Sequence, residues 1–355
     1  MIVKHLTLKN FRNHSYLNYD FSPNMNIITG ENATGKTSVV EAVYYLSIAR
    51  SFRTIEDSEL IQKGKEKAEI EAIVAEGDIS RKIRIVITKD AKQVFLNGKA
   101  ISRLSELAKC TNVVVFEPKD VQLFKGSPKT RRNFLDISLS KQSPVYFDAI
   151  SNYERVLRER NEVLKADKPD QILLDSYTEM LIKYSTPIVA YRQKYVKDIN
   201  DILNKITRAL TGANDKFEVN YKPFVPYDDK FQDNAKKAFI SALESDLHRK
   251  VTSIGVHRED ISIALNGRDI GIYGSQGENR IAALALKLSP YFLIDDRDKR
   301  PIVVLDDVMS ELDSTHKEKL IKFLQRFEQV FITATKLEVE GASHYQIKKK
   351  TKEVF

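Results

Sequence analysis

The sequence predicts an α/β fold in which a mixed sheet with flanking helices and a β-rich subdomain is interrupted by an inserted helical lobe. Three observations predict this arrangement. Near the N-terminus, the apolar run NIITG leads through a glycine-containing loop into a helical pattern over 37–48. After Pro128, apolar residues recur at the spacing of amphipathic helices. Toward the C-terminus, helix and strand patterns alternate again and end with the run QVFITAT.

The first part of the chain is predicted to be rich in strands. Residues 2–8 alternate between two faces, and several stretches within 68–102 do the same. Asn97 and Gly98 lie between two apolar runs, and this pair predicts a two-residue hairpin turn. The run TNVVVF has the continuous apolar character of a buried strand.

The middle of the chain is predicted to form the helical lobe. Helical patterns run through VYFDAISNYERVLRERNEVLK and then from Gln171 to Leu210, where one or two helices would fit. No heptad of apolar residues is sustained, so we expect a compact lobe without a long coiled coil. A second Asn-Gly hairpin is expected at Asn266. The expected division is a first lobe built from 1–125 and 251–355, and a mostly helical second lobe at 126–250.

The composition favours a folded, basic protein. The 355 residues carry 57 Lys and Arg against 49 Asp and Glu, and this net charge of +8 is compatible with a nucleic-acid partner without establishing one. Cys110 is the one cysteine, so an internal disulfide is excluded and a reducing compartment is favoured. We recognise neither a signal peptide nor an apolar run long enough to span a bilayer, and we expect a cytoplasmic protein without a membrane partner.

The segment GENATGKTS matches the phosphate-binding loop pattern G-x-x-x-x-G-K-[ST] in full. In such a Walker A loop Lys36 neutralises phosphate oxygens, a catalytic role, and the Thr37 hydroxyl contacts Mg²⁺. An ordinary glycine turn before a helix is the alternative, but a strand before the loop and a helix after it are the context that the motif requires. The residues expected to contact a nucleotide are Gly30, Glu31, Asn32, Ala33, Thr34, Gly35, Lys36, Thr37 and Ser38.

Two carboxylates supply the second half of the expected site. The apolar run at 302–305 ends at Asp306 and Asp307, and ligands of α/β sheets bind at the carboxyl ends of the strands. We expect Asp306 to hold Mg²⁺, directly or through water, and Asp307 to act catalytically by polarising the attacking water. Two solvated loop acids are the alternative. No Asn-Lys-x-Asp guanine-reading sequence occurs, so ATP is favoured over GTP.

Two further segments resemble parts of an ABC-type ATPase head. The turn SQGE opens the helical pattern that precedes the acidic pair, and SELD follows that pair. The resemblance implies that the first is a signature turn that contacts the γ-phosphate bound by a second protomer: Ser275, Gln276, Gly277 and Glu278. It implies that the second is a D-loop at the dimer interface: Ser310, Glu311, Leu312 and Asp313.

Over nearly its whole length the chain is similar to the RecF family, in segments that include FEPKDVQLFKGSPKTRRNFLDISLS, GVHREDISIALNGRDIGIYGSQGENRIAALALKL and PIVVLDDVMSELD. The resemblance implies an SMC/Rad50-like ABC-type P-loop ATPase head that forms an ATP-dependent homodimer on DNA. It implies action at single-strand gaps and junctions of single- and double-stranded DNA, with RecR and RecO, to promote RecA loading. Replication-fork recovery, SOS induction and a weak, DNA-stimulated ATPase that serves as a switch belong to the same expectation.

Some positions depart from the family's pattern or have an open role. Glu278 stands within a segment where paired glutamines are usual, and Asp307 stands where many ABC ATPases carry glutamate, which indicates slow turnover. Thr335 lies near the position of a histidine switch. By resemblance Arg12 is expected against a phosphate, and a surface arginine is the alternative. Three residues near the expected Q-loop remain open: Glu117, Asp120 and Gln122.

Other polar residues have simpler interpretations. Arg131 and Arg132 could contact DNA or close the lobe interface, but a solvated helix face is favoured. For His257 a core position with a satisfied partner and a site role are equally compatible. The basic tail at 348–352 could touch phosphates or be solvated.

Two other functions stay open on sequence alone. One is the ATPase subunit of a transporter, which would need a membrane partner. The other is an SMC-like structural head, which the missing heptads disfavour.

Overall fold

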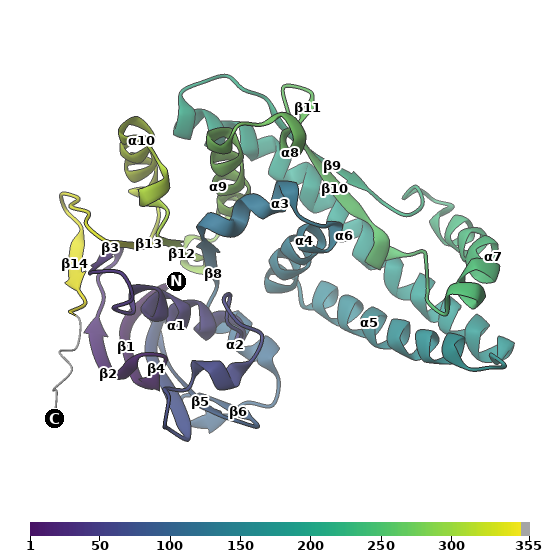
Figure 1. The fold of residues 1–355 in the computed structure, drawn as a ribbon, viewed down its shortest axis with the longest axis horizontal. Helices are drawn as coiled ribbons and strands as arrows, with labels where there is room; N and C mark the ends of the chain where they lie inside the picture. The colour runs from purple at the N-terminus through teal and green to yellow at the C-terminus, as the bar shows by residue number, and fades with distance from the viewer. Residues whose placement is uncertain (349–355) are drawn as a thin grey trace. The chain divides into compact units, whose positions relative to one another are not determined.

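The computed structural model describes residues 1–348 (Figure 1). The chain forms two compact units. Unit 1 comprises Met1–Asp120, Ile206–Ala213 and the described residues from Leu284 onward. Unit 2 comprises Val121–Lys205 and Asn214–Ala283. Of the basic tail, all but the first lysine lies outside the described residues.

The second unit is therefore larger than the helical lobe expected from sequence, because it also takes in residues 251–283. The physical reason is pairing within unit 2. The strand Asp260–Leu265 pairs antiparallel with Phe217–Lys222. Arg131, on a helix, also forms a two-pronged ion pair with Asp260, through Nε to Oδ1 at 2.7 Å and Nη2 to Oδ2 at 2.8 Å.

Unit 1 contains two sheets, each with strands of one orientation type. The six-stranded antiparallel sheet has the order β2-β1-β4-β5-β6-β7, with β1 (Ile2–Phe11), β2 (His14–Asp20), β4 (Lys67–Glu76), β5 (Ile79–Thr88), β6 (Lys92–Leu96) and β7 (Lys99–Ala100). The five-stranded parallel sheet has the order β14-β3-β13-β12-β8, with β3 (Asn24–Thr29), β8 (Val113–Phe116), β12 (Ile302–Asp306), β13 (Gln329–Ala334) and β14 (Ser343–Gln346). All residues of β12 and β13 are buried, as expected for inner strands of a parallel sheet.

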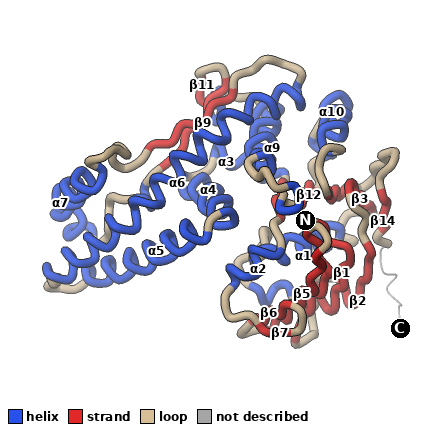
Figure 2. The backbone as a smooth tube through the Cα atoms, turned by 180° about the vertical axis from the view of Figure 1, so that it is seen from behind, coloured by secondary structure: helices blue, strands red, loops and turns tan. Residues whose placement is uncertain are grey.

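One helix joins the two sheets into a common core. Helix α1 (Lys36–Ile48) contacts β1 of the antiparallel sheet and β8, β12 and β13 of the parallel sheet (Figure 2). It is buried on nearly all sides, which explains why its sequence is apolar without a clear polar face. The other helical segments of unit 1 are α2 (Leu104–Cys110), α10 (Ser314–Leu324) and the 3-10 turns Asp57–Leu60, Arg297–Lys299 and Met309–Glu311; a further turn spans Pro118–Val121.

A buried glutamine adds a polar link between the sheets. Gln329, at the start of β13, exchanges two hydrogen bonds with the backbone of Val3 on β1, at 2.8 and 2.9 Å. Its amide nitrogen also donates to the Ser22 carbonyl at 2.9 Å. Because every polar atom of this fully buried side chain is used, the link fixes how the sheets meet without leaving an unpaired group.

Unit 2 is mostly helical, with one small sheet. Its helices are α3 (Gln122–Lys125), α4 (Pro128–Gln142), α5 (Pro144–Lys165), α6 (Gln171–Thr211), α7 (Phe231–Arg249), α8 (Ile270–Tyr273) and α9 (Gln276–Phe292), with a 3-10 turn at Val256–Arg258; the last residues of α6 and α9 belong to unit 1. Its antiparallel sheet has the order β11-β10-β9, with β9 (Phe217–Lys222), β10 (Asp260–Leu265) and β11 (Arg268–Asp269). Helix α6 is one continuous helix of 41 residues with Pro187 inside it. Within residues 1–348, no helix is long and apolar enough to cross a membrane.

Both predicted Asn-Gly hairpins are confirmed. Asn97 and Gly98 have φ of 48° and 81°, and Asn266 and Gly267 have φ of 50° and 79°. Two successive left-handed residues are typical of a type I′ turn, whose twist matches the flanking strands. The turns connect β6 to β7 and β10 to β11.

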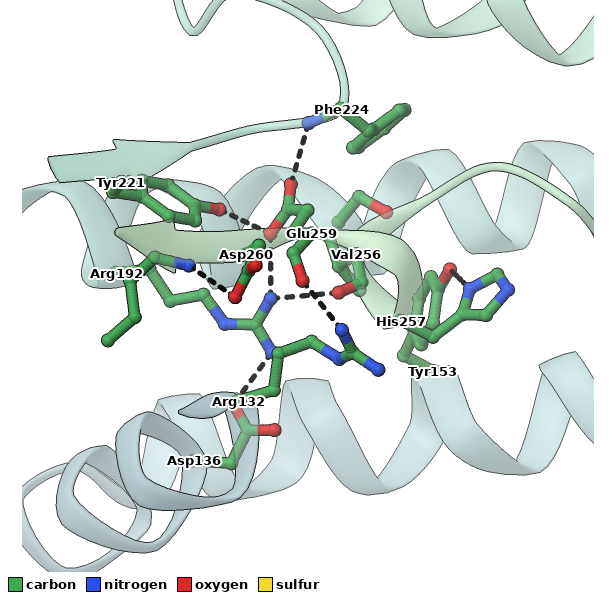
Figure 3. Close-up of polar contacts among 12 residues, drawn as sticks. Arg132, Asp136, Tyr153, Arg192, Tyr221, Phe224, Val256, His257, Glu259 and Asp260 are labelled. Atoms are coloured by element: carbon green, nitrogen blue, oxygen red, sulfur yellow. Dashed lines mark hydrogen bonds and ion pairs between the residues drawn. The ribbon is translucent and has the colours of Figure 1, made fainter. Parts of the chain in front are cut away.

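A buried ion network holds unit 2 together around Arg192 of α6, which is 1% exposed (Figure 3). The guanidinium donates to Asp136 of α4 at 2.7 Å and to Glu259 at 2.6 Å. It also donates to the Val256 carbonyl at 2.9 Å. Glu259 accepts further hydrogen bonds from the Tyr221 hydroxyl and from a backbone N–H. The network therefore ties α4, α6, β9 and the segment before β10 to one another.

Two expectations about polar residues of this region are now decided. The solvated helix face proposed for Arg131 and Arg132 is wrong, because Arg131 is 13% exposed and paired with Asp260, and Arg132 donates to the Glu259 carbonyl at 2.6 Å. His257 is half-buried and has a partner for each ring nitrogen: its Nδ1 lies 2.8 Å from the Tyr153 hydroxyl and its Nε2 lies 3.0 Å from a backbone carbonyl oxygen.

Replacing Arg192 by methionine should destabilise the protein by about 3–5 kcal/mol, because the buried Glu259 and the half-buried Asp136 would keep their charges without their partner. Thermal unfolding followed by circular dichroism would measure the loss. Lys194→Met is the matched control, since Lys194 lies on the same helix with a side chain that is 74% exposed. Equal melting temperatures for the two variants would contradict this account of the network.

The free energy of unfolding should rise with pH between about pH 4 and 6.5 because of His257. Burial lowers the pKa of His257 from 6.5 to about 4, so the unfolded chain binds a proton in this window that the folded chain does not. The slope from this group is at most about 1.4 kcal/mol per pH unit. Urea unfolding at pH 5 and pH 7.5 should show a larger loss for the parent than for His257→Gln, and equal losses would refute the assignment.

Candidate functional site

The loop between β3 and α1 is shaped by two glycines that no other residue could replace without strain. Gly30 and Gly35 have φ of 155° and 105°. A Cβ on Gly30 would lie 2.5 Å from the Ile347 carbonyl oxygen, and one on Gly35 would overlap the side chains of Asn13 and His14. The loop is thus held closely against its surroundings, as a backbone that wraps an anion must be.

The start of α1 is open to an anion. The N-cap residue Gly35 has no side chain that could cap the helix, and the first turn contains no acidic residue. The first backbone N–H groups of any helix have no intrahelical acceptor, so those of α1 are available to a ligand. The positive end of the helix dipole strengthens their attraction for an anion. Such a helix end, preceded by a glycine loop, is a ready site for phosphate.

Lys36 is folded over the loop. Its ammonium donates to the carbonyl oxygens of Gly30 at 2.8 Å and Glu31 at 2.9 Å, and the residue is 7% exposed. The side chain of Thr34 also donates to Glu31, at 2.9 Å. The lysine thus spans the concave side of the loop, where it is placed to meet phosphate oxygens.

Two residues that sequence reasoning missed support the loop from the β1–β2 turn. The Asn13 amide donates to the Thr34 carbonyl at 2.9 Å, and His14 Nε2 lies 3.1 Å from the Gly35 carbonyl oxygen. No motif signals them, because their role depends on a turn that precedes the loop in sequence and packs against it in space.

The acidic pair at the end of β12 meets the loop as expected. The Thr37 hydroxyl donates to Asp306 Oδ1 at 2.9 Å, although the two residues are far apart in sequence. Thr333 at the end of β13 donates to the same oxygen at 2.6 Å and accepts from the Asp307 backbone N–H at 2.9 Å. Asp307 has φ of 54°, a left-handed conformation that turns its exposed side chain away from the strand direction.

The environment of Asp306 fits a cation. Burial raises the pKa of this carboxyl, and a nearby positive charge would favour its ionised form. Residues 1–348 contain no cluster of three or more His, Cys, Asp or Glu side chains that could bind a metal alone. Mg²⁺ commonly binds through one or two protein oxygens together with phosphate oxygens and waters. Thr37 and Asp306 are compatible with that mode, in which a bound nucleotide completes the ligand set.

A cleft of about 950 Å³ opens over these groups within unit 1. Its size is in the range of small-molecule sites. The charged residues that line it are mainly cationic: Arg12, Lys36, Arg53 and Lys63, against Glu59 and Asp307. The cleft therefore favours a negatively charged ligand.

Two of these cations share one buried carboxylate. Arg12 forms a two-pronged ion pair with Glu41 of α1, at 2.6 and 3.0 Å, and Arg53 Nη1 lies 3.0 Å from Glu41 Oε2. The Glu41 side chain is fully buried, whereas that of Arg53 is 40% exposed. Two guanidinium groups against one carboxylate leave a net positive charge at the cleft. The phosphate contact expected for Arg12 stays a prediction, and Arg53 is a further candidate without a sequence signal.

The remaining predicted residues of unit 1 border the same strand ends. The Thr335 hydroxyl lies 3.4 Å from Asn32 Oδ1 in the phosphate loop. Ser310 donates to the Asp307 carbonyl at 2.8 Å, and Asp313 caps α10 through the His316 N–H at 3.0 Å. Their roles as switch and D-loop stay predictions.

The Q-loop position stays open. Asp120 pairs with Lys287 of α9 at 2.8 Å, and Glu117 pairs with Lys119 at 3.0 Å. Gln122 begins α3 of unit 2. The cleft lining includes none of the three candidates.

The predicted signature segment lies in unit 2 at the start of α9, with Ser275 just before the helix and the other three residues in its first turn. Ser275, Gln276, Gly277 and Glu278 are all exposed. A Cβ on Gly277 would meet nothing within 4 Å, so no contact within the described chain requires glycine there. A surface of this kind is accessible to another molecule.

Comparisons with known proteins agree with this picture. A family model described as "RecF/RecN/SMC N terminal domain" matches residues 2–353. The DNA replication and repair protein RecF of Halalkalibacterium halodurans is 36% identical over 99% of this chain and 96% of that protein. RecF of Streptococcus pneumoniae strain CGSP14 is 36% identical over 95% of this chain and 93% of that protein.

Solved structures show the same relation. The recombination mediator protein RecF, described as RecF-ATP in the RecFOR pathway, superposes with a TM-score of 0.90 at 32% identity, over 98% of this chain and 97% of that one. An Smc head domain of Pyrococcus furiosus, bound to the C-terminal domain of ScpA, has a TM-score of 0.54 at 17% identity over 94% and 89%, which shows a shared fold alone. The expected fold class, an α/β head with an inserted helical lobe, is confirmed, although the expected mixed sheet is instead one antiparallel and one parallel sheet.

Gly35→Ala should destabilise the protein by roughly 1–3 kcal/mol, because it combines a left-handed backbone with an overlap at Asn13 and His14. Gly277→Ala is the matched control: it meets no atom, lies in a helix, and should change stability by less than about 1 kcal/mol. Denaturant unfolding of both variants tests the comparison. Similar losses would show that the loop is not held as tightly as described.

Proposed function

The chain belongs to the RecF family, and on that premise we propose that it is an ATP-dependent DNA-binding protein of recombinational repair. In this proposal two copies close around ATP at single-strand gaps and at junctions of single- and double-stranded DNA. With RecO and RecR the dimer promotes RecA loading, replication-fork recovery and SOS induction. Slow hydrolysis of ATP then releases the DNA, so that the ATPase serves as a switch.

The observation that carries the proposal is the meeting of Thr37 with Asp306 at the floor of a cationic cleft. A phosphate loop alone would be compatible with many ligands. The loop, a buried carboxylate at a strand end and a second carboxylate beside it are the parts that phosphoryl-transfer sites need. RecF relatives described with ATP support the choice of nucleotide.

The residues divide the work by position. Lys36 and the first amides of α1 hold the phosphates and neutralise their charge. Thr37 and Asp306 are placed to hold Mg²⁺, which would offset the charge that develops on the phosphate oxygens. Asp307 accepts a hydrogen bond from the attacking water and orients it. Thr335, whose hydroxyl lies 3.4 Å from Asn32 Oδ1 in the loop, serves as the switch residue in this proposal.

The dimer supplies what one copy lacks. A closed two-fold dimer presents the same surface from both partners, so Ser275 of each copy would meet the nucleotide of the other. The exposed turn and the empty space around Gly277 support this arrangement. The segment at 310–313 begins three residues after Asp307, and in this proposal it crosses the interface as the D-loop.

The DNA and protein partners rest on family membership. The net charge of +8 favours attraction to a polyanion, and it predicts binding that weakens as salt rises. RecR and RecO are proposed because relatives of known structure are described within the RecFOR pathway.

Asp307→Asn should reduce ATP hydrolysis by at least about 100-fold while ATP binding and dimerisation persist, because it removes the charged group that orients and polarises the water. Asp90→Asn, at an exposed loop position, is the control and should behave like the parent. Hydrolysis is measured by phosphate release with gapped duplex DNA. Assembly is measured by sedimentation with and without ATP and Mg²⁺.

Hydrolysis by Asp307→Asn at the parent rate would contradict the role of that carboxylate. Parent protein that stays monomeric with saturating ATP and DNA would contradict the clamp as a whole. Robust hydrolysis without any effect of DNA would favour a transporter-type ATPase subunit instead.

A further inference from the structure

The turn before α9 is closed by a reciprocal pair of hydrogen bonds. The Ser275 backbone N–H donates to Glu278 Oε2 at 2.7 Å, and the Glu278 N–H donates to the Ser275 hydroxyl at 3.2 Å. This is a capping box, in which the first and fourth residues of a helix start satisfy each other. Both residues are exposed, so the box is accessible from solvent.

The turn is held rigidly from behind. The Asn279 amide nitrogen donates to the carbonyl oxygens of Gly274 at 2.9 Å and Ser275 at 2.8 Å. A Cβ on Gly274 would lie 2.5 Å from the Ile270 carbonyl oxygen, so the backbone there has no room to move. Asn279 is 1% exposed, and its Oδ1 has no hydrogen-bond partner within the described chain. The Asn279 side chain thus uses its amide nitrogen to bind the turn, while its amide oxygen remains without a partner among the described residues.

The capping box places a carboxylate where an anionic ligand would bind. The first amides of a helix and the positive end of its dipole attract phosphate and carboxylate alike. The hydrogen bonds from Ser275 lower the pKa of Glu278, so this carboxyl is ionised at neutral pH. The start of α1 differs, since it has no cap and no acid in its first turn. In the proposed dimer the starts of α1 and α9 both meet one nucleotide, but only the start of α9 carries a carboxylate of its own.

We propose that Glu278 is an internal competitor for the phosphate at the start of α9 and weakens the ATP-driven closure of the dimer. The inference rests on the proposed function, in which that helix end meets the nucleotide of a second copy. To contact the phosphate, the Ser275 N–H must give up its bond to the Glu278 carboxylate or share it. The carboxylate and phosphate also repel each other at short range. A closed dimer contains two such sites, so the effect counts twice.

Glu278→Gln separates the charge from the cap. Glutamine serves equally in a capping box, so the turn and the fold should be kept. The variant should dimerise roughly 3- to 30-fold more tightly, the range for removing one unfavourable charge at each of two helix ends. Sedimentation with a non-hydrolysable ATP analogue and Mg²⁺ measures the dissociation constant. The gain should shrink as ionic strength rises, which a purely structural effect would not produce.

Glu162→Gln is the matched control, since it makes the same change on α5 at a side chain that is 71% exposed. It should leave the dissociation constant unchanged. Gln276→Lys is a second test that keeps the capping box and adds a positive charge beside it; it should also tighten the dimer. Unchanged melting temperatures would show that both variants are folded.

Three outcomes are distinguishable. Tighter dimers for Glu278→Gln, with a gain that salt reduces, support the inference. Parent and variant dimers of equal strength, or a weaker variant dimer, overturn it and leave the proposed function intact. Parent and variants that all stay monomeric with the nucleotide analogue contradict the proposed dimer and the inference with it.

Discussion

The buried carboxylate of Asp306 is the constraint on which the nucleotide end of this molecule depends. It lies at the end of a strand whose residues are all buried, and its Oδ1 accepts hydroxyl hydrogen bonds from Thr37 and Thr333. A charge in that position is costly unless it is satisfied, so the phosphate loop and β13 must both meet it. The start of α1, the end of β13 and the turn at Asp307 meet at or beside this carboxylate. Asp306, the proposed ligand of a cation, is thus the residue at which the phosphate loop, β12 and β13 meet.

Buried acids recur in this chain with two different kinds of partner. Glu41 is held by two arginines at the cleft, and Glu259 and Asp136 are held by Arg192 inside unit 2. These carboxylates have permanent cations and build structure. Asp306 has hydroxyl donors only, and burial raises its pKa. Among the described residues Asp306 has no cation in direct contact, although Arg53 lies near enough to favour its ionised form, and this distinguishes it from the carboxylates that are ion-paired.

Local patterns predicted much of the fold, and contacts between distant segments limited the rest. The strand, loop and helix around Lys36, the buried strand before Asp306 and both Asn-Gly hairpins depend on adjacent residues, and each was predictable. The membership of 251–283 in unit 2 was not, because it depends on strand pairing and on the ion pair between Arg131 and Asp260. The support of the phosphate loop by Asn13 and His14 was missed for the same reason. The sequence around an arginine on a helix looks the same whether its side chain is solvated or forms an ion pair with a distant acid, as Arg131 does.

The order of strands in the parallel sheet has a consequence for synthesis on the ribosome. Both neighbours of β3 come from the last part of the chain, roughly 300 residues after β3 itself. At the usual rate of translation, β3 and the loop behind it wait roughly 15–60 s for their partners. During that interval an apolar strand presents two unpaired edges, each a template for pairing with another nascent chain. The parallel sheet, which joins strands from distant parts of the chain beneath the phosphate loop, is therefore incomplete for most of its own translation, when a chaperone or rapid burial of β3 against α1 would matter most.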